Sequence, residues 1–285
     1  MKRLIIFFVG VFFIPLFANA QFWEIGGMIG GSNYAGDLSP TPIVFKETHP
    51  AIGAFVRANI KKSFSLKGNL YYGRVSGKDV NSDVEKRVNR NLSFRSNLLE
   101  VGLNGEYNIL PFETGSRKNK SAPYVFAGLA IFKFDPRAYW DTNPDDDVDG
   151  EWVRLQPLGT EGQGTTQYNE REKYSLTQVS IPFGAGLKHN FAGNWNVGLE
   201  VGWRKTFTDY IDDVSMTYVE DYILKGQKSD LSALLSDRTQ EVVPSFERSS
   251  RTSKEERGND TNKDWYMFAG ITISYTIMPH YCFRF

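Results

Sequence analysis

The stretch that decides the fold is WNVGLEVGWR, residues 195–204, in which apolar and polar residues alternate without interruption. A β-strand directs successive side chains to opposite faces, so this stretch has one apolar face and one polar face. The apolar face begins at Trp195 and ends at Trp203. Aromatic residues at both ends of an apolar band are typical of strands that cross the outer membrane.

Seven further stretches complete a set of eight predicted strands. Five of them alternate in the same way, at residues 52–60, 64–72, 99–107, 179–187 and 265–275. Residues 22–31 and 124–134 are less regular, and the faces of the second cannot be assigned from the sequence. The strands are close to the roughly 9–11 residues that a tilted membrane crossing requires.

The connections between these strands differ in length in a regular order. The long ones are residues 33–48, 78–93, 135–173 and 208–264, and the shorter ones are residues 61–63, 110–122 and 191–193. All long connections therefore fall at one end, as in bacterial barrels with long outer loops and short periplasmic turns. We predict an all-β fold, an eight-stranded antiparallel up-and-down transmembrane β-barrel. A soluble β-sandwich is the alternative, but it does not account for loops on one side.

The N-terminus indicates export. Lys2 and Arg3 precede an apolar run at residues 4–17, and Ala18-Asn19-Ala20 matches a cleavage site. We interpret residues 1–20 as a signal peptide and residues 21–285 as the barrel, located in the outer membrane among its lipids. A membrane-spanning helix is the alternative, but the apolar run is shorter than the roughly 20 residues that a helix needs.

Composition agrees with this fold and excludes some functions. The 33 basic and 33 acidic residues cancel, so there is no electrostatic case for nucleic acid. A mean hydropathy of -0.38 resembles that of a soluble protein, but a barrel has no long apolar run to raise the average. The single cysteine, Cys282, allows no internal disulfide.

The polar faces predict a filled lumen. An eight-stranded barrel has an interior only wide enough for side chains, so charges there need partners of opposite sign. We therefore expect ion pairs across the lumen, in place of a conducting pore, among the charged residues Arg57, Lys67, Glu100, Glu106, Lys188, Glu200 and Arg204.

Candidate chemistry in the loops is incomplete. Asp145, Asp147 and Asp149 match the first half of a calcium loop, but Gln156 stands where a bidentate Glu is needed. A solvated acidic loop tip is the alternative, and we predict no cofactor and no metal site. The carboxylates that follow residue 207 are expected to cap that strand or to pair with loop arginines; they are Asp209, Asp212 and Asp213.

The remaining loop motifs indicate no catalysis. Residues 159–165 are rich in glycine but lack the lysine of a phosphate loop, so they predict a structured turn. His49, His189 and His280 show no Ser-His-acid spacing, and we expect neither an enzyme nor a small-molecule substrate. Residues 218–235 can form an amphipathic helix, which either packs over the barrel mouth or binds a partner.

Five stretches resemble one family. Residues 30–38, 90–96, 123–128, 155–165 and 204–215 are together similar to the PorG family of outer-membrane barrels, which is associated with the type IX secretion system. The resemblance implies a non-enzymatic component that supports protein export and, in gliding bacteria, motility. It also implies partners in the periplasm, namely a ring formed by a lipoprotein and its periplasmic partner. The alternative is a stand-alone OmpA-like barrel for surface adhesion or envelope stability.

The predicted orientation selects the surface that would meet such a ring. The longer periplasmic connection contains Arg117, Lys118 and Lys120, and a solvated connection is the alternative reading of this basic turn. The C-terminal tail is the second candidate, through His280, Tyr281, Phe283, Arg284 and Phe285. Its terminal Phe and alternating aromatics also resemble the signal that directs barrels into the membrane.

Overall fold

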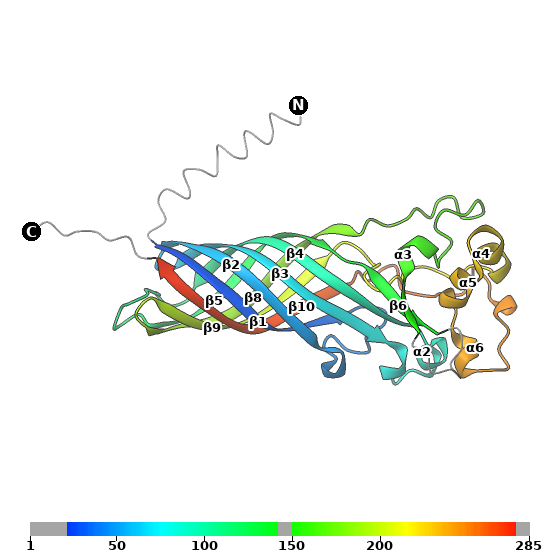
Figure 1. Ribbon diagram of the computed structural model, residues 1–285, viewed down its shortest axis with the longest axis horizontal. Coiled ribbons are helices and arrows are strands. Elements are labelled where there is room, and N and C mark those ends of the chain that lie inside the picture. Colours follow the sequence, from blue (N-terminus) through cyan, green and yellow to red (C-terminus); the bar gives the residue numbers. More distant parts are fainter. Residues whose placement is uncertain (1–21, 142–149, 278–285) are drawn as a thin grey trace, which may run out of the picture.

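The computed structural model describes residues 22–141 and 150–277, and eight antiparallel strands in it form a barrel (Figure 1). The strands are β1 (Phe22–Ala35), β2 (His49–Lys61), β3 (Phe64–Lys78), β4 (Ser93–Asn108), β5 (Ser121–Lys133), β8 (Thr177–Ala192), β9 (Trp195–Thr206) and β10 (Trp265–Ile277). The signal peptide predicted at residues 1–20 lies outside the described residues.

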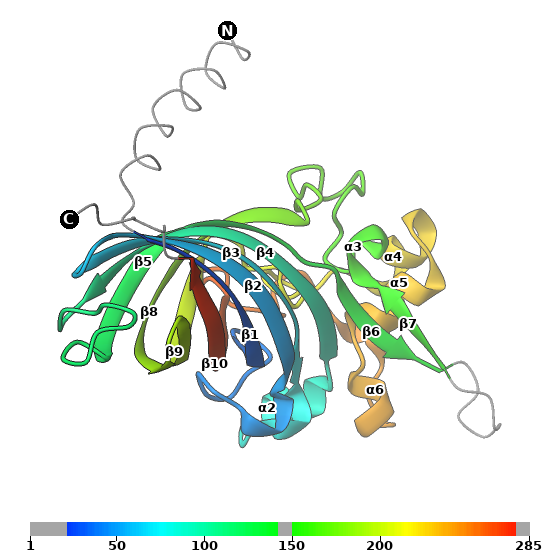
Figure 2. The ribbon, with the colours of Figure 1, turned by 60° about the vertical axis from the view of Figure 1, so that its left-hand side comes forward.

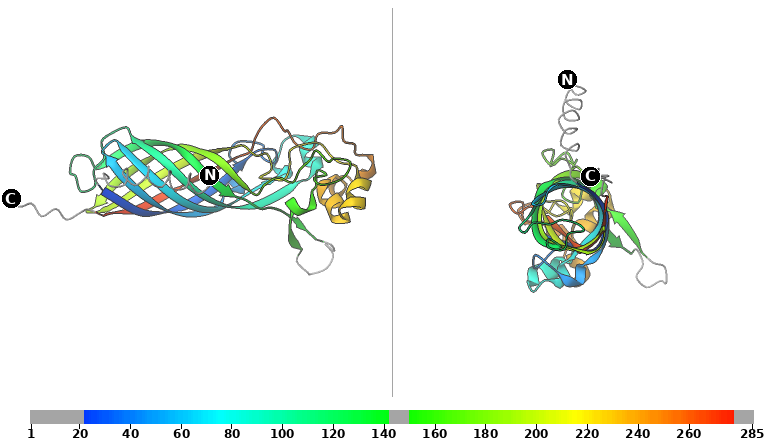
Figure 3. Two further views of the ribbon diagram at one scale, coloured as in Figure 1. Left: turned by 90° about the horizontal axis from the view of Figure 1, so that it is seen from above. Right: turned by 90° about the vertical axis from the view of Figure 1, so that its left-hand side faces the viewer.

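The sheet closes because the last strand pairs with the first. β10 and β1 are antiparallel over their whole length, from Trp23 opposite Ile277 to Ala35 opposite Trp265. β3 pairs with β4 in the same way, so every barrel strand has two neighbours. Figure 3 shows the resulting ring when the barrel is viewed along its axis. The predicted eight-stranded antiparallel barrel is confirmed.

The outer surface of the wall is apolar. Aliphatic side chains on it are largely exposed, including Ile29 at 72%, Leu129 at 64% and Val101 at 60%. Aromatic pairs lie near the two ends of this belt, Trp195 with Tyr275 at one end and Phe183 with Trp265 at the other. A continuous exposed apolar belt with aromatic borders on a closed barrel is the surface that lipid covers, so the protein is located in the outer membrane.

β5 explains why its faces could not be assigned from the sequence. Its buried side chains are aromatic, as in Tyr124, Phe126 and Phe132, whereas its exposed ones are aliphatic, as in Val125 and Leu129. Both faces are therefore apolar, and the period of two is invisible to a test that separates only apolar from polar residues.

The long connections all lie at one end of the barrel (Figure 1). We refer to them as outer loop 1 (residues 36–48), loop 2 (79–92), loop 3 (134–176) and loop 4 (207–264). They contain the 3₁₀ turns η1 (Phe45–Glu47), η2 (Asp79–Asn81) and η3 (Arg248–Ser250) and the helices α2 (Glu85–Arg90), α3 (Leu155–Leu158), α4 (Asp221–Gln227), α5 (Asp230–Ser236) and α6 (Thr239–Val242). Among the described residues, no helix combines the length and apolar character needed to cross a membrane.

Loop 3 contains a hairpin that the sequence did not predict. β6 (Pro136–Trp140) and β7 (Glu151–Arg154) pair with each other, and β6 continues the sheet from β4 at Ser96. Figure 2 shows this hairpin standing apart from the barrel wall. Strands of five and four residues inside a charged loop are too short to display a clear alternation.

The prediction of one continuous helix at residues 218–235 is wrong. The structure has two helices, α4 and α5, because the Ser229 side chain accepts a hydrogen bond from the Ser232 amide at 3.1 Å and starts a new helix. Ile223 and Leu224 of α4 are buried among the outer loops, whereas Tyr222 is exposed. The apolar residues of α4 and α5 therefore mostly pack against the other outer loops. Their spacing in the sequence is irregular because the helix is interrupted between α4 and α5.

A close contact between β1 and β10 supplies a test of the wall. A Cβ atom at Gly30 would lie 2.0 Å from the Ala269 carbonyl oxygen, whereas one at Gly68 would have no neighbour within 4 Å. We expect Gly30→Ala to lower the free energy of unfolding by about 1–3 kcal/mol, as overpacking does. Gly68→Ala should change it by less than about 0.5 kcal/mol. Urea unfolding in detergent, followed by tryptophan fluorescence, measures both, and equal effects would contradict the contact.

Candidate functional site

The lumen contains the predicted ion pairs. Arg57 donates from Nη1 to Glu24 Oε1 at 2.7 Å and from Nη2 to Glu106 Oε1 at 3.1 Å. Lys188 Nζ donates to Glu106 Oε2 at 3.1 Å. All four side chains are nearly inaccessible to solvent. Glu24 was missing from the predicted set because the glycine-rich β1 alternates poorly.

A second group of ion pairs crosses the lumen nearer the outer end. Lys67 donates to Glu200 at 2.5 Å, and Arg204 Nε donates to Glu100 at 2.9 Å. Tyrosine hydroxyls donate further hydrogen bonds to these carboxylates, from Tyr124 to Glu200 at 2.7 Å and from Tyr266 to Glu100 at 2.9 Å. The four cations and four carboxylates of the two groups balance, so the lumen is filled by a neutral network.

The periplasmic turn (residues 109–120) folds across the inner opening of the barrel. Phe112 and Thr114 are buried, and the Thr114 hydroxyl lies 3.0 Å from the Thr276 hydroxyl. The Gly115 amide donates to Asn190 Oδ1 at 3.1 Å. The turn is therefore a fixed plug, and its buried anchors were not visible in the sequence, where the basic residues dominate.

The predicted partner-binding residues of this turn lie on its exposed side. Arg117, Lys118 and Lys120 are solvent-exposed, and none forms an ion pair with a carboxylate in residues 22–141 or 150–277. The other predicted partner-binding residues, His280, Tyr281, Phe283, Arg284 and Phe285, lie outside the described residues. The three basic side chains therefore lie on the exposed side of one turn, and we refer to them as the basic platform. The role of the tail in partner binding stays a prediction.

The calcium candidates Asp145, Asp147 and Asp149 also lie outside the described residues. Within the described ranges, no group of three or more His, Cys, Asp or Glu side chains is arranged to hold a metal ion. Gln156, at the position where a calcium loop needs Glu, donates to the Tyr174 carbonyl at 3.1 Å.

The glycine-rich segment of loop 3 is the structured turn that the sequence predicts. Gly159, Gly162 and Gly164 have φ values of +63°, +81° and +73°, a backbone region that favours glycine. The turn buries Glu161, which accepts hydrogen bonds from the Ser215 amide at 2.9 Å and from Arg257 Nη1 at 2.9 Å. Loop 3 is thereby tied to loop 4 by a buried ion pair.

Two carboxylates at the outer rim share one tyrosine. The Tyr34 hydroxyl lies 2.6 Å from Asp212 Oδ2 and 2.9 Å from Asp264 Oδ1. A hydroxyl has one proton to donate, so the second contact requires a proton on one of the carboxyl groups. Burial raises the pKa of Asp212 and of Asp264 well above the usual range, which is consistent with this shared proton. Hydrogen bonds between the Tyr34 hydroxyl of β1 and two carboxyl groups of loop 4, one of them protonated, therefore hold loop 4 against the end of β1.

The other predicted loop carboxylates also have partners in loop 4. Asp213 lies 3.9 Å from Arg257 Nη2, as expected for pairing with a loop arginine, and accepts a hydrogen bond from Tyr174 at 2.5 Å. Asp209 accepts from the Ser215 hydroxyl at 2.8 Å. They hold the loops together.

His49 has a serine neighbour that the sequence did not reveal. Its Nε2 lies 2.7 Å from the Ser76 hydroxyl, which donates to Glu47. In a catalytic triad the acid orients the histidine, whereas here the acid accepts the proton of the serine. His189 contacts the Ser121 hydroxyl at 2.7 Å near the periplasmic end, and His280 lies outside the described residues.

Comparison with known proteins gives one family match. The model of a family described as a domain of unknown function (DUF6089) matches residues 2–155. The comparison with curated proteins finds no match.

Several solved structures are similar to the barrel. The N-terminal β-barrel domain of OprF from Pseudomonas aeruginosa is 14% identical, with 90% of this chain and 98% of that chain covered and a TM-score of 0.34. Ail, the attachment invasion locus protein of Yersinia pestis, is 9% identical, with 90% and 99% covered and a TM-score of 0.39. Neisserial surface protein A is 8% identical, with 89% and 96% covered and a TM-score of 0.39.

The lumen network predicts an unequal cost for two glutamates. Glu106→Ala leaves Arg57 and Lys188 buried without this carboxylate, and we expect a loss of about 3–5 kcal/mol in the free energy of unfolding. Glu113→Ala breaks only an exposed pair with Lys62 and should cost less than about 1 kcal/mol. Urea unfolding measures both, and similar costs would show that the lumen charges do not depend on each other.

The outer loops should be more stable at low pH. Burial raises the pKa of Asp209 to about 7, and its Oδ1 has no hydrogen-bond partner among the described residues. A raised carboxyl pKa stabilises the fold fully below the unfolded pKa of about 4, and this stabilisation is lost as the pH rises through 7. We expect loop 4 amides to be more protected from hydrogen exchange at pH 5 than at pH 8, after correction for the intrinsic rates.

Asp209→Asn should reduce this pH dependence, because the amide does not titrate. Asp260→Asn changes an exposed loop carboxylate and is the control. Identical pH profiles for the wild type and Asp209→Asn would assign the effect to other groups.

Proposed function

The chain belongs to the family described as a domain of unknown function (DUF6089), which assigns no activity, and from this premise we propose that it is a non-enzymatic outer-membrane component of the type IX secretion system. In this role the barrel associates, from the periplasmic side, with the ring formed by a lipoprotein and its partner. It supports protein export and, in gliding bacteria, motility. The five stretches that resemble the PorG family support this role, and they extend from residue 30 to residue 215, beyond the residues that the family model matches.

The observation that carries the proposal is the basic platform of the periplasmic turn. Arg117, Lys118 and Lys120 are exposed, while Phe112 and Thr114 anchor the same turn in the barrel. A fixed backbone presents these charges at little entropic cost, which favours binding to an acidic surface. The last described strand, β10, ends at Ile277 at the same end of the barrel, and the C-terminal tail at residues 279–285 is the second proposed contact.

A second candidate function is supported by the other end of the barrel. Loops 3 and 4 have a buried core of their own, with Glu161 and Arg257 at its centre. A folded outer surface suits a stand-alone barrel that serves adhesion or envelope stability. Deletion of the gene distinguishes the two functions, since loss of adhesion with normal export favours the second.

Charge reversal of the platform tests the first function. We expect the triple variant Arg117→Glu, Lys118→Glu and Lys120→Glu to insert normally and to recover at least tenfold less of the ring when it is purified from detergent-solubilised outer membranes. The loss corresponds to about 1.4 kcal/mol or more of binding free energy.

The matched control reverses three exposed lysines of the outer loops, Lys46, Lys254 and Lys263, and should recover the ring as the wild type does. Undiminished ring recovery by the platform variant would overturn the proposed contact. Normal export in a deletion strain would overturn the role in secretion.

A further inference from the structure

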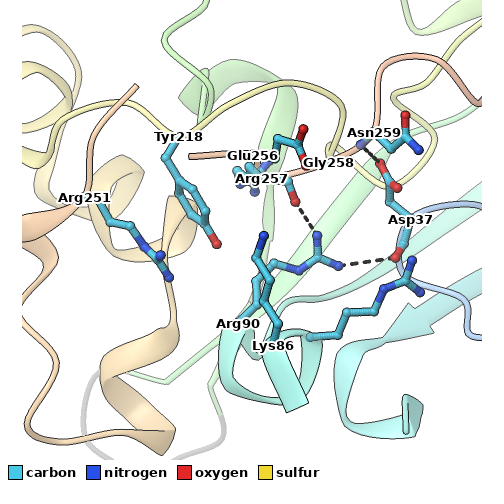
Figure 4. Close-up of a pocket in the computed structure, with 10 residues that line it drawn as sticks. Asp37, Lys86, Arg90, Tyr218, Arg251, Glu256, Arg257, Gly258 and Asn259 are labelled. Atoms are coloured by element: carbon cyan, nitrogen blue, oxygen red, sulfur yellow. Dashed lines mark hydrogen bonds between the residues drawn. The ribbon is translucent and has the colours of Figure 1, made fainter. Parts of the chain in front are cut away.

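The outer loops enclose a pocket of about 250 Å³ (Figure 4). Its walls come from three loops that are distant in sequence, since Asp37 belongs to loop 1, Arg90 to loop 2 and Arg257 to loop 4. Pockets for drug-sized ligands usually measure about 300–1,000 Å³. This pocket is therefore the size of one small polar ligand, such as a single sugar with its substituent.

Cations dominate the lining. Five are present, Lys86, Arg87, Arg90, Arg251 and Arg257, against the two carboxylates of Asp37 and Glu256. Three of the cations are fixed from behind by carboxylates outside the lining, as in the pairs of Arg90 with Asp79 at 2.7 Å and Arg251 with Asp237 at 2.7 Å. Arg257 is held in the same way by Glu161 at 2.9 Å.

Three donors of the pocket remain available. Lys86 and Arg87 form no ion pair with any carboxylate in the described part of the chain, and Arg87 keeps donors besides the one at Nη1, which donates to the Ser39 carbonyl at 3.3 Å. The Tyr218 side chain is 2% exposed, yet its hydroxyl makes no hydrogen bond to another described residue. Figure 4 shows this hydroxyl directed into the pocket, between Arg251 and Arg90, with Lys86 extending from α2 toward the same space.

The Tyr218 hydroxyl faces the pocket without a partner among the described residues, so the oxygen of a ligand there can accept its proton. Tyr218 keeps its proton to donate, because burial raises its pKa to about 12. Its ring is held against the Arg251 guanidinium at 4.3 Å, so the hydroxyl is fixed in direction. The donors therefore form a preorganised site for the oxygens of an anion.

We propose that this pocket binds the phosphate group of a phosphorylated sugar on the outer side of the membrane. Lys86, Arg87 and the Tyr218 hydroxyl contact the phosphate oxygens, which suit a set made only of donors. The Glu256 carboxylate and the Asn259 amide lie at the same pocket and accept and donate to sugar hydroxyls. The ligand bridges loops 1, 2 and 4 and is independent of any contact at the periplasmic end.

Binding to the purified full-length barrel in detergent tests the site. Isothermal titration with glucosamine 6-phosphate, at low ionic strength, should give saturable binding, whereas uncharged glucosamine derivatives such as N-acetylglucosamine should not bind. We expect Lys86→Glu to weaken binding at least tenfold. Tyr218→Phe retains the packing on Arg251 and should weaken binding about threefold to tenfold through the lost hydrogen bond.

Lys46→Glu is the matched control, since it makes the same charge change on an exposed outer-loop lysine away from the pocket. Heat-modifiable migration on gels verifies that each variant is folded. Equal binding by the wild type, Lys86→Glu and Tyr218→Phe would overturn the proposal. Inorganic phosphate that binds as tightly as the sugar phosphate would overturn the assignment to a saccharide.

A second arm identifies the source of the sugar phosphate. Lipopolysaccharide micelles, native or enzymatically dephosphorylated, replace the soluble sugar in the same titration. Binding of the native form alone, lost in Lys86→Glu, assigns the site to a membrane glycolipid, and binding of the soluble sugar alone assigns it to a free or secreted saccharide. Failure of both probes to bind overturns the proposal.

Discussion

The rest of the structure depends on the pairing of buried charges in the lumen. The carboxylate of Glu106, which accepts hydrogen bonds from Arg57 and Lys188, is the clearest case. A barrel of eight strands has no room for water around such charges, so each charge on the polar faces must meet its opposite across the lumen. The alternation of the strands places these residues inside and the aliphatic residues in lipid. The same alternation therefore sets both the membrane surface and the neutral, filled interior.

A filled lumen moves function to the two ends. The inner opening is covered by the periplasmic turn through Phe112 and Thr114, and the outer opening is covered by loops 3 and 4. The two ends differ in kind. The inner end presents a small, fixed basic platform, whereas the outer end is a folded layer with its own core and a polar pocket.

Three of the five stretches that resemble the PorG family meet at the outer rim. Tyr34 from the first stretch contacts Asp212 from the last at 2.6 Å, and Glu161 from the fourth accepts from Ser215 at 2.9 Å. Tyr34 and Asp212 are 178 residues apart in the chain, and Glu161 and Ser215 are 54 residues apart, yet all four side chains are buried together at the rim. These contacts connect the outer loops to one another and to β1, and the pocket beside Tyr218 lies where loops 1, 2 and 4 join.

The sequence by itself determined the eight strands, the side on which the loops lie, and seven of the eight charges of the lumen network. Each depends on the period of two and on loop length, which are local properties. It did not reveal Glu24, because glycines interrupt the alternation of β1, or the faces of β5, whose two sides are both apolar.

Only the tertiary structure decided that Phe112 and Thr114 plug the barrel, that Tyr34 joins Asp212 to Asp264, and that Lys86 and Tyr218 face one pocket. These residues are brought together by barrel closure and by packing between loops. Such contacts join positions far apart in the chain, and no local pattern encodes which distant partner a loop residue will meet.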